Sequence, residues 1–185
     1  PTPPPAAPPE PVHIKTLLVL PFQDMARIYG EDVTIQCRLC GDVFTTGKVE
    51  PDAVDWMTEQ VTTLLKERKN LEIAPDSLAE GARSAVLSAE KGEISERELL
   101  VKVGSSVGTD AVLLGKVYRF RDRDGNAFSV ASPASVAFEI DLVRVSDGRV
   151  VWNGHFDETQ QSLFENLFQW HTFWERQARW ITAKE

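Results

Sequence analysis

The chain has few of the residues that most often carry chemistry. It has two cysteines and three histidines, and His13, His155 and His171 lie far apart in the sequence. No His-Glu-x-x-His helix and no phosphate-binding glycine loop are present. The stretch Gly104-Ser105-Ser106-Val107-Gly108 precedes a predicted strand instead of opening a helix, so we interpret it as a connection and not as a nucleophile elbow or an anion site. The sequence therefore predicts a protein that is not an enzyme.

Excess positive charge and long hydrophobic runs are also missing. The net charge is −8 and the pI is about 5.0, which argues against nucleic acid, because phosphates need a basic surface. No apolar run approaches the roughly 20 residues needed to cross a bilayer. The length of 185 residues and the 42% hydrophobic content suit one domain with a sizeable core. We expect no cofactor, no resident metal and no small-molecule substrate.

Proline is concentrated at the start of the chain. Residues 1–11 are mostly proline and alanine. Proline lacks an amide donor and fixes φ, so such a segment forms no packed core and favours an extended spacer. We predict a disordered tether over 1–11 that follows a lipid anchor upstream of Pro1; an ordinary disordered tail is the alternative. Residues 12–185 are predicted to form a single α/β domain.

The second half of the chain carries the strongest fold signal. An apolar strand is predicted over 110–117, and a second strand over 136–143 alternates apolar and polar residues. Alternation at period two predicts one buried and one wet face. Asp147-Gly148 separates the second strand from a third over 150–156, and Asp-Gly between two such runs is a strong hairpin signal. The three strands predict an antiparallel meander.

The first half of the chain adds a strand and helices. The continuous apolar run over 16–22 contains a proline near its end and suits a central strand buried on both faces. The other predicted elements are a helix from Pro51 with the apolar stripe Val54, Met57, Val61 and Leu64, a short strand over 71–74, and helices over 77–89 and 95–107. The order β-α-β-α-α-β-β-β-α predicts an α/β fold, with a mixed β-sheet, an antiparallel meander and helices packed against the sheet.

Three stretches resemble a family of bacterial envelope proteins. They cover residues 17–22, 109–117 and 138–152. They are similar to the opening strand, the central strand and the hairpin of a group that includes the Tol translocation protein N-terminal domain, the curli secretion lipoprotein and the lipoprotein activators of penicillin-binding proteins. This resemblance implies a periplasmic lipoprotein domain, tethered to the outer membrane, that is not an enzyme and binds or assembles with other envelope proteins.

The two cysteines lie in a predicted long loop over 23–50, as Cys37-Arg38-Leu39-Cys40-Gly41. Cys-x-x-Cys-Gly is half of a zinc knuckle, but the other half is missing unless a metal is shared across a dimer. A thioredoxin-like motif would open a helix after a strand, and the next predicted helix begins only near Pro51. In an oxidising compartment a local disulfide is a further interpretation. We predict a Cys37–Cys40 disulfide; a thiol-dependent redox or zinc-binding envelope protein is the alternative function.

Aromatic residues are concentrated in the C-terminal segment over 162–182. Leucine and tryptophan recur there at helical spacing, which predicts an aromatic helix with one apolar stripe. One interpretation is that this helix closes the core of the sheet. The other is a contact surface, because tryptophan is enriched at binding hot spots, and the segment has few basic residues for a lipid surface. The residues predicted to bind an envelope protein or a second copy are Trp170, Phe173, Trp174 and Trp180.

Overall fold

The structure is a computed structural model, and it describes residues 13–122, 124–125, 130–132 and 134–159. The strands are β1 (Thr16–Val19), β2 (Gln23–Asp24), β3 (Thr34–Gln36), β4 (Val43–Thr45), β5 (Glu72–Ile73), β6 (Ala111–Arg121), β7 (Asp124–Gly125), β8 (Val130–Ser132), β9 (Ser135–Arg144) and β10 (Val150–Thr159). The helices are α1 (Met25–Tyr29), α2 (Ala53–Lys66), α3 (Asp76–Ala89) and α4 (Glu96–Val107).

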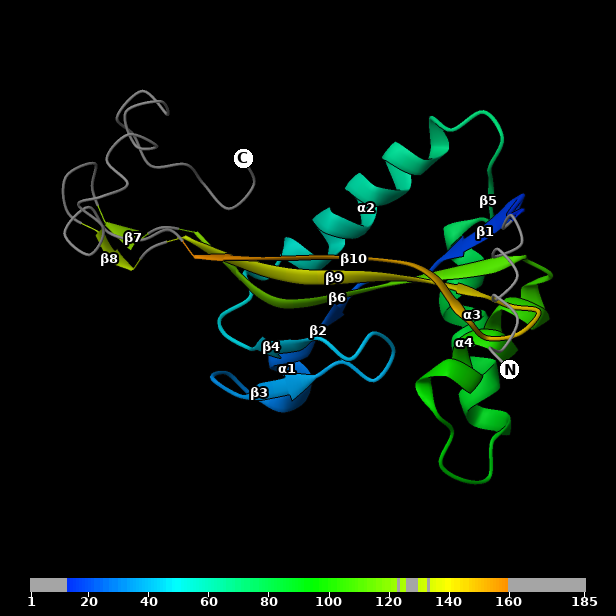
Figure 1. The fold of residues 1–185 in the computed structure, drawn as a ribbon, viewed down its shortest axis with the longest axis horizontal. Coiled ribbons are helices and arrows are strands. Elements are labelled where there is room, and N and C mark those ends of the chain that lie inside the picture. Colours follow the sequence, from blue (N-terminus) through cyan, green and yellow to red (C-terminus); the bar gives the residue numbers. More distant parts are fainter. Residues whose placement is uncertain (1–12, 123, 126–129, 133, 160–185) are drawn as a thin grey trace, which may run out of the picture.

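A mixed sheet of six strands organises the described residues (Figure 1). Its order is β10-β9-β6-β1-β5, with β2 also paired to β6. β1 pairs in parallel with β5 and β6, whereas β6, β9 and β10 form an antiparallel meander. Leu17, Leu18 and Val19 of β1 are buried, as expected for a central strand covered on both faces. The predicted fold class is confirmed.

Helices cover both faces of the sheet. α2 packs on one face, where Met57 joins the core, and α3 and α4 pack on the other, where Leu100 is buried. α4 begins at the predicted capping box, in which Ser95 and Glu98 bond to each other's backbone N–H. It ends at Gly108, whose φ of 81° lies in the left-handed region that favours glycine. No helix in the described part of the chain is long and apolar enough to cross a membrane.

The apolar face of α2 differs at one position from the predicted stripe. Val54, Met57 and Val61 contact the core, as predicted. Leu64 is exposed over 61% of its surface, and Leu65 packs against the core in its place. Steps of three and four residues both stay near one face of a helix, so the position of the sheet decides that Leu65, and not Leu64, packs against the core. The prediction for Leu64 was wrong.

The segment over 23–50, predicted as an irregular loop, contains regular structure. α1 begins after Asp24, whose side chain accepts a hydrogen bond from the Arg27 N–H at 2.9 Å. β3 and β4 then form a hairpin, which lies on the opposite side of the long strands from α2 (Figure 1). Phe44 of β4 stacks on Tyr118 of β6, with 4.2 Å between ring centroids. These elements are too short to show a hydrophobic period in the sequence.

Strand β9 buries its polar face more deeply than its apolar face. Glu139 and Asp141 are fully buried, on the side covered by the β3–β4 hairpin. Phe138 and Ile140 point to the other face and are only partly buried. The predicted alternation is confirmed, but hydrophobicity alone predicts the opposite order of burial. The buried polar face of β9 is therefore the part of the sheet that needs a chemical explanation.

Candidate functional site

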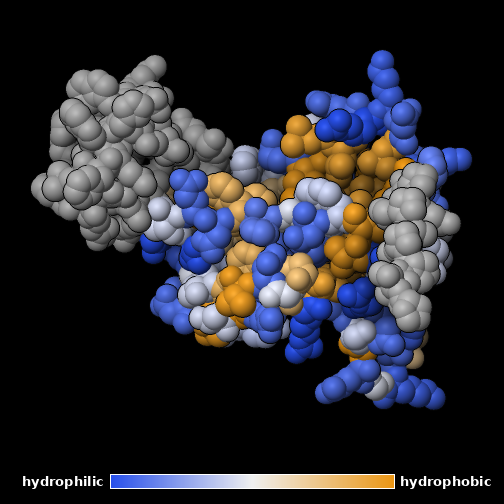
Figure 2. Space-filling view, in the orientation of Figure 1, coloured by the Kyte–Doolittle hydropathy of each residue, from blue (hydrophilic) through white to orange (hydrophobic). Residues whose placement is uncertain are grey.

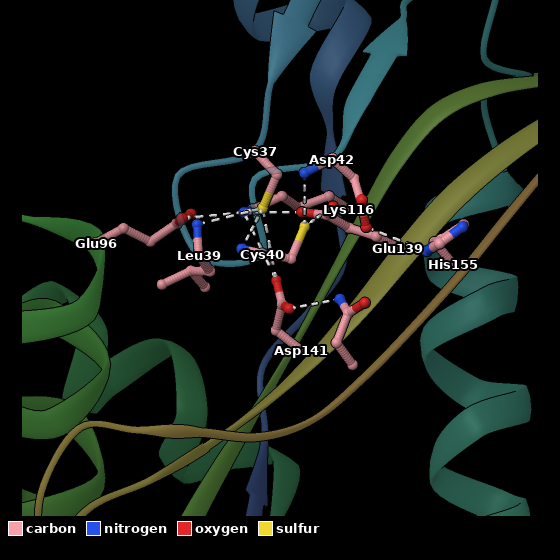
Figure 3. A network of polar contacts seen from close by, with 10 residues as sticks. Cys37, Leu39, Cys40, Asp42, Glu96, Lys116, Glu139, Asp141 and His155 are labelled. Atoms are coloured by element: carbon pink, nitrogen blue, oxygen red, sulfur yellow. Dashed lines mark hydrogen bonds and ion pairs between the residues drawn. The ribbon is translucent and has the colours of Figure 1, made fainter. Parts of the chain in front are cut away.

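The Cys-x-x-Cys-Gly motif forms the tip of the β3–β4 hairpin (Figure 3). The Cys37 N–H donates to the Asp42 carbonyl at 2.8 Å, and the Gly41 N–H donates to the Cys37 carbonyl at 3.1 Å. Gly41 has a φ of 89°, a left-handed conformation that residues with a Cβ rarely adopt. This tight turn places both thiols against the sheet.

Backbone amides surround the two sulfur atoms. The N–H groups of Leu39 and Cys40 donate to Cys37 Sγ at 3.3 and 3.2 Å. The Asp42 N–H donates to Cys40 Sγ at 3.4 Å. Cys37 is buried, Cys40 is half-buried, and both are free thiols in the structure. The Cys37–Cys40 disulfide is not formed here and stays a prediction.

A buried lysine and two buried carboxylates lie beneath the thiols. Lys116 projects from β6, and Glu139 and Asp141 project from β9; none is more than 2% exposed. The Lys116 Nζ lies 3.1 Å from Glu139 Oε1. It also lies 2.9 Å from Oε2 of Glu96, which begins α4. Because a buried charge needs an opposite charge and hydrogen bonds, Lys116 is the residue that makes these buried carboxylates tolerable.

The thiols contact this charged group directly. Cys40 Sγ donates to Glu139 Oε2 at 3.2 Å, and Lys116 Nζ lies 3.7 Å from Cys37 Sγ. Cys37 Sγ also lies 4.0 Å from Asp141 Oδ2. The two sulfurs and one carboxylate oxygen of Glu139 all lie within 4.8 Å of one another. We name Cys37, Cys40 and Glu139 the Cys–Glu cluster.

Three further side chains border the cluster. The Asn153 Nδ2 donates to Asp141 Oδ1 at 2.8 Å, and His155 Nδ1 lies 3.1 Å from Asp42 Oδ2 at the hairpin tip. Tyr118 is fully buried, and its hydroxyl makes no hydrogen bond of standard geometry with a described residue. Burial raises its pKa, and the neighbouring Glu139 carboxylate adds to this as a charge and as a nearby acceptor. Buried hydroxyls are nearly always paired in proteins. The Tyr118 hydroxyl is thus an unusual feature of this region.

Burial and neighbouring charges shift the pKa values of the buried ions. Burial raises the pKa of Asp141 to about 6, and the hydrogen bond from Asn153 acts in the opposite direction. Burial by itself would lower the pKa of Lys116, but the carboxylates of Glu96 and Glu139 outweigh it and raise that pKa above its usual value. Lys116 is therefore charged at neutral pH.

The thiols are not activated as nucleophiles. Burial raises the pKa of Cys37, although the Cys40 N–H acts in the opposite direction. Burial raises the pKa of Cys40 as well, and its hydrogen bond with Cys37 adds to this. Redox enzymes need a thiol whose pKa is lowered, because the thiolate is the attacking species. The arrangement therefore does not favour redox catalysis by these thiols.

A groove of about 510 Å³ lies beside the cluster. Cys37, Lys116 and Tyr118 line it, together with Glu96 and Leu99 from α4. Cys37 is only 4% exposed, yet it forms part of this wall. A small ion therefore has a route to the sulfur.

The stretch over 104–108 reads Gly-x-Ser-x-Gly, but it is not a nucleophile elbow. Ser106 lies in the last turn of α4, and its Oγ donates to the Val103 carbonyl at 2.8 Å. A nucleophile elbow instead joins a strand to the start of a helix. The stretch precedes β6, as predicted, but residues 104–107 belong to α4 and only Gly108 leads out of the helix.

Sequence reasoning found part of the site and missed the rest. It singled out Cys37 and Cys40, which the structure brings together with Glu139. Lys116 within the apolar strand was the available signal, because a charge in a buried strand needs a partner on a neighbouring strand. The predicted tether over 1–11 lies outside the described residues. So do the predicted partner-binding residues Trp170, Phe173, Trp174 and Trp180.

Comparisons with known proteins find similarity of structure only. No protein-family model and no curated protein sequence matches the chain. The LpoB C-terminal domain from Salmonella enterica is 15% identical with a TM-score of 0.47, over 82% of this chain and 87% of that chain. Lipoprotein GNA1162 from Neisseria meningitidis is 14% identical with a TM-score of 0.48, over 88% and 97%. The PelC dodecamer from Paraburkholderia phytofirmans is 15% identical with a TM-score of 0.45, over 86% and 84%. The predicted resemblance to envelope lipoproteins is thus confirmed as a structural similarity at low sequence identity.

Proposed function

We propose that this chain is a non-enzymatic domain of a cell-envelope lipoprotein and that it works by protein–protein association. Its contact surface is the apolar face of β9 and β10, with the edge of β10 that no described strand covers, and its partner is a second copy of the chain. One observation carries this proposal. Trp152 and Phe156, both on the edge strand, are exposed over 52% and 43% of their surfaces.

The apolar face of β9 and β10 is continuous across the two strands. Phe156 is paired with Phe138, and their rings stack with 5.8 Å between centroids. Trp152 is paired with Leu142, and its ring lies over Gly154, where a Cβ would approach it to 2.4 Å. Figure 2, in the orientation of Figure 1, shows that hydrophobic side chains reach the surface in patches between hydrophilic ones. Exposed apolar patches with large aromatics are typical of contact sites between proteins.

The edge of β10 favours a second copy as the partner. Among the described strands, β10 is paired only with β9. It is ten residues long and contains neither lysine nor proline, which commonly protect an exposed edge, and its two carboxylates, Asp157 and Glu158, lie near its C-terminal end. If the β10 strands of two copies paired antiparallel with Gly154 at the centre, Trp152 of one copy would lie opposite Phe156 of the other. Two-fold symmetry would then create the same aromatic pair twice in the dimer. Cross-strand aromatic pairs stabilise such a sheet.

The oligomeric state of the full chain tests this proposal. Trp152→Lys places a charge on the contact surface, whereas Leu64→Lys places the same charge on α2, where Leu64 is 61% exposed. We expect the wild type and Leu64→Lys to sediment as dimers and Trp152→Lys to sediment as a folded monomer. A monomeric wild type, or a Trp152→Lys variant that dimerises like the wild type, contradicts self-association through this surface.

We also propose that the domain lies in the periplasm, tethered to the outer membrane by a lipidated N-terminus. Support comes from the sequence resemblance to envelope proteins and from the proline-rich stretch over 1–11, whose composition suits a spacer. Labelling of the full-length precursor with a radioactive fatty acid, followed by membrane fractionation, tests this location. Unlabelled protein in the cytoplasmic fraction contradicts it.

A further inference from the structure

The Cys–Glu cluster has the donor atoms and the spacing of a zinc site. Zinc binds thiolate sulfur at about 2.3 Å and carboxylate oxygen at about 2.0–2.2 Å, so donors around one tetrahedral ion lie about 3.5–4 Å apart. The sulfurs of Cys37 and Cys40 and a carboxylate oxygen of Glu139 lie within 4.8 Å of one another. The Cys40 Sγ and Glu139 Oε2 are already 3.2 Å apart. A small adjustment of side chains brings all three donors onto one ion.

The hairpin tip is built to hold negatively charged sulfur. Three backbone N–H groups, from Leu39, Cys40 and Asp42, point at the two sulfurs over 3.2–3.4 Å. Hydrogen bonds of this kind stabilise a metal-bound thiolate and orient it towards the metal. A disulfide or a pair of neutral thiols gains less from these donors, because its sulfur carries no full charge.

The charge of the surroundings also suits a divalent cation. Two thiolates, one carboxylate and one Zn²⁺ together leave one excess negative charge. The Lys116 ammonium lies 3.7 Å from Cys37 Sγ and 3.1 Å from Glu139 Oε1, so it offsets part of this negative charge and orients two of the three donors. Glu96 and Asp141 share the same ammonium, so the surroundings remain negative and favour a cation. Lys116 is therefore a positioning residue of this site and not a ligand.

The Tyr118 hydroxyl is an independent indication of a ligand at this place. It is fully buried and makes no hydrogen bond of standard geometry with a described residue, and the acceptor that acts on it is the Glu139 carboxylate of the cluster itself. Three protein donors leave one tetrahedral position for water. A zinc-bound water is a hydrogen-bond partner of the kind that this hydroxyl lacks. The groove lined by Cys37 and Tyr118 is the route by which the ion and the water enter.

We propose that Cys37, Cys40 and Glu139 bind one Zn²⁺ ion, with water in the fourth position. On binding, each thiol loses its proton to solvent, and the two sulfur electron pairs form bonds to the metal; no oxidant or reductant takes part. The site is distinct from the contact surface on the other face of β9 and β10, so either proposal can fail alone. A Cys37–Cys40 disulfide excludes this site, because its sulfurs can no longer act as thiolates.

Metal titration of the full-length chain, isolated without added reductant and then stripped of metal, tests the proposal. Native mass spectrometry should find one Zn²⁺ per chain. Titration with Co²⁺ should produce the intense near-ultraviolet absorption of thiolate-to-cobalt charge transfer and the visible bands of a tetrahedral ion, and Zn²⁺ should abolish both. The charge-transfer absorption reports sulfur ligation in the wild type itself, so this test does not depend on whether a variant folds.

Variants identify the ligands. Cys37→Ser, Cys40→Ser and Glu139→Gln should each weaken zinc binding by roughly a hundredfold or more. Glu96→Gln is the matched control, because Glu96 contacts Lys116 at 2.9 Å but supplies no donor to the cluster. It should bind zinc within a few-fold of the wild type. Any one of three results overturns the assignment. The first is a protein mass that shows a Cys37–Cys40 disulfide, and the second is a reduced wild type without cobalt charge-transfer absorption. The third is a Glu139→Gln variant that binds zinc like the wild type.

Discussion

The Cys40 thiol donates a hydrogen bond at 3.2 Å to the carboxylate of Glu139, which lies 99 residues further along the chain. This contact joins the tip of the β3–β4 hairpin to the middle of the sheet. The Phe44–Tyr118 ring stack joins the base of the same hairpin to β6. The hairpin is therefore the cover over the buried charges of β6 and β9, and changes to those charges should affect the stability of the whole domain.

Lys116→Met should strongly destabilise the protein. Methionine removes the ammonium but keeps most of the unbranched apolar side chain, and it leaves Glu139 as a buried carboxylate without its counter-ion. Removing one partner of a buried ion pair typically lowers the free energy of unfolding by about 3–5 kcal/mol. Urea unfolding at neutral pH measures the change in the free energy of unfolding.

Lys102→Met is the control for that prediction. Lys102 pairs with Glu90, but its side chain is 49% exposed, so water replaces the lost contact. The expected cost is about 1 kcal/mol or less. Adding Glu139→Gln to Lys116→Met should restore part of the lost stability, because it removes the unpaired charge. Equal losses of unfolding free energy in Lys116→Met and Lys102→Met would show that burial of the Lys116 charge does not determine the effect.

Gly104→Ala should destabilise α4, whereas Gly81→Ala should stabilise α3. A Cβ at Gly104 would lie 2.4 Å from Val145 Cγ2 and 2.7 Å from Val112 Cγ2, and these branched side chains cannot move aside freely. Such overpacking costs about 1–3 kcal/mol. A Cβ at Gly81 meets nothing within 4 Å, so alanine should add about 0.5–1 kcal/mol through its helix preference. Thermal unfolding measures the shift in melting temperature, which should be downward for Gly104→Ala and upward for Gly81→Ala. Shifts of the same sign in both variants contradict this account.

Asp110→Asn should lower stability at neutral pH and lose its effect in acid. The Asp110 carboxylate accepts hydrogen bonds from the N–H groups of Thr16 and Lys15, both at 2.9 Å, and these lower its pKa below the usual 3.8. A carboxyl with a lowered pKa stabilises the fold above its unfolded pKa, and this contribution is lost as pH falls through the folded value. The expected loss at neutral pH is roughly 1 kcal/mol or less, because Asp110 is exposed.

Urea unfolding from neutral pH down to below pH 3.8 measures the difference between Asp110→Asn and the wild type. That difference should shrink across the acid end of the range. Glu59→Gln, on the exposed side of α2, is the control and should leave the free energy of unfolding at neutral pH nearly unchanged. A pH-independent effect of Asp110→Asn is the result that contradicts the prediction.

Trp170→Ala with Trp174→Ala should weaken association without unfolding the protein. Both residues lie outside the described residues, and their predicted helical spacing places them one turn apart. Truncating a tryptophan at a binding hot spot typically costs ~2 kcal/mol or more. Light scattering and capture of envelope proteins by the purified chain measure the effect. Loss of the folded state identifies the segment as core, and unchanged association contradicts a contact surface there.

The sequence by itself determined the elements whose signals are local. β1 and the first half of β6 are apolar runs, the hairpin between β9 and β10 contains Asp147-Gly148, and α4 begins at its own capping box. Each of these signals lies within a few residues of the element that it specifies. The pairing of β9 with β10 then follows from the short turn between them.

Only the tertiary structure decided which faces are buried and which side chains meet. Glu139 is buried because a hairpin from residues 34–45 covers it, and no periodicity within β9 contains that information. Leu65 replaces Leu64 in the core because the sheet sets the rotation of α2. The Cys–Glu cluster joins residues about a hundred positions apart, so its chemistry exists only once the sheet and the hairpin have packed together.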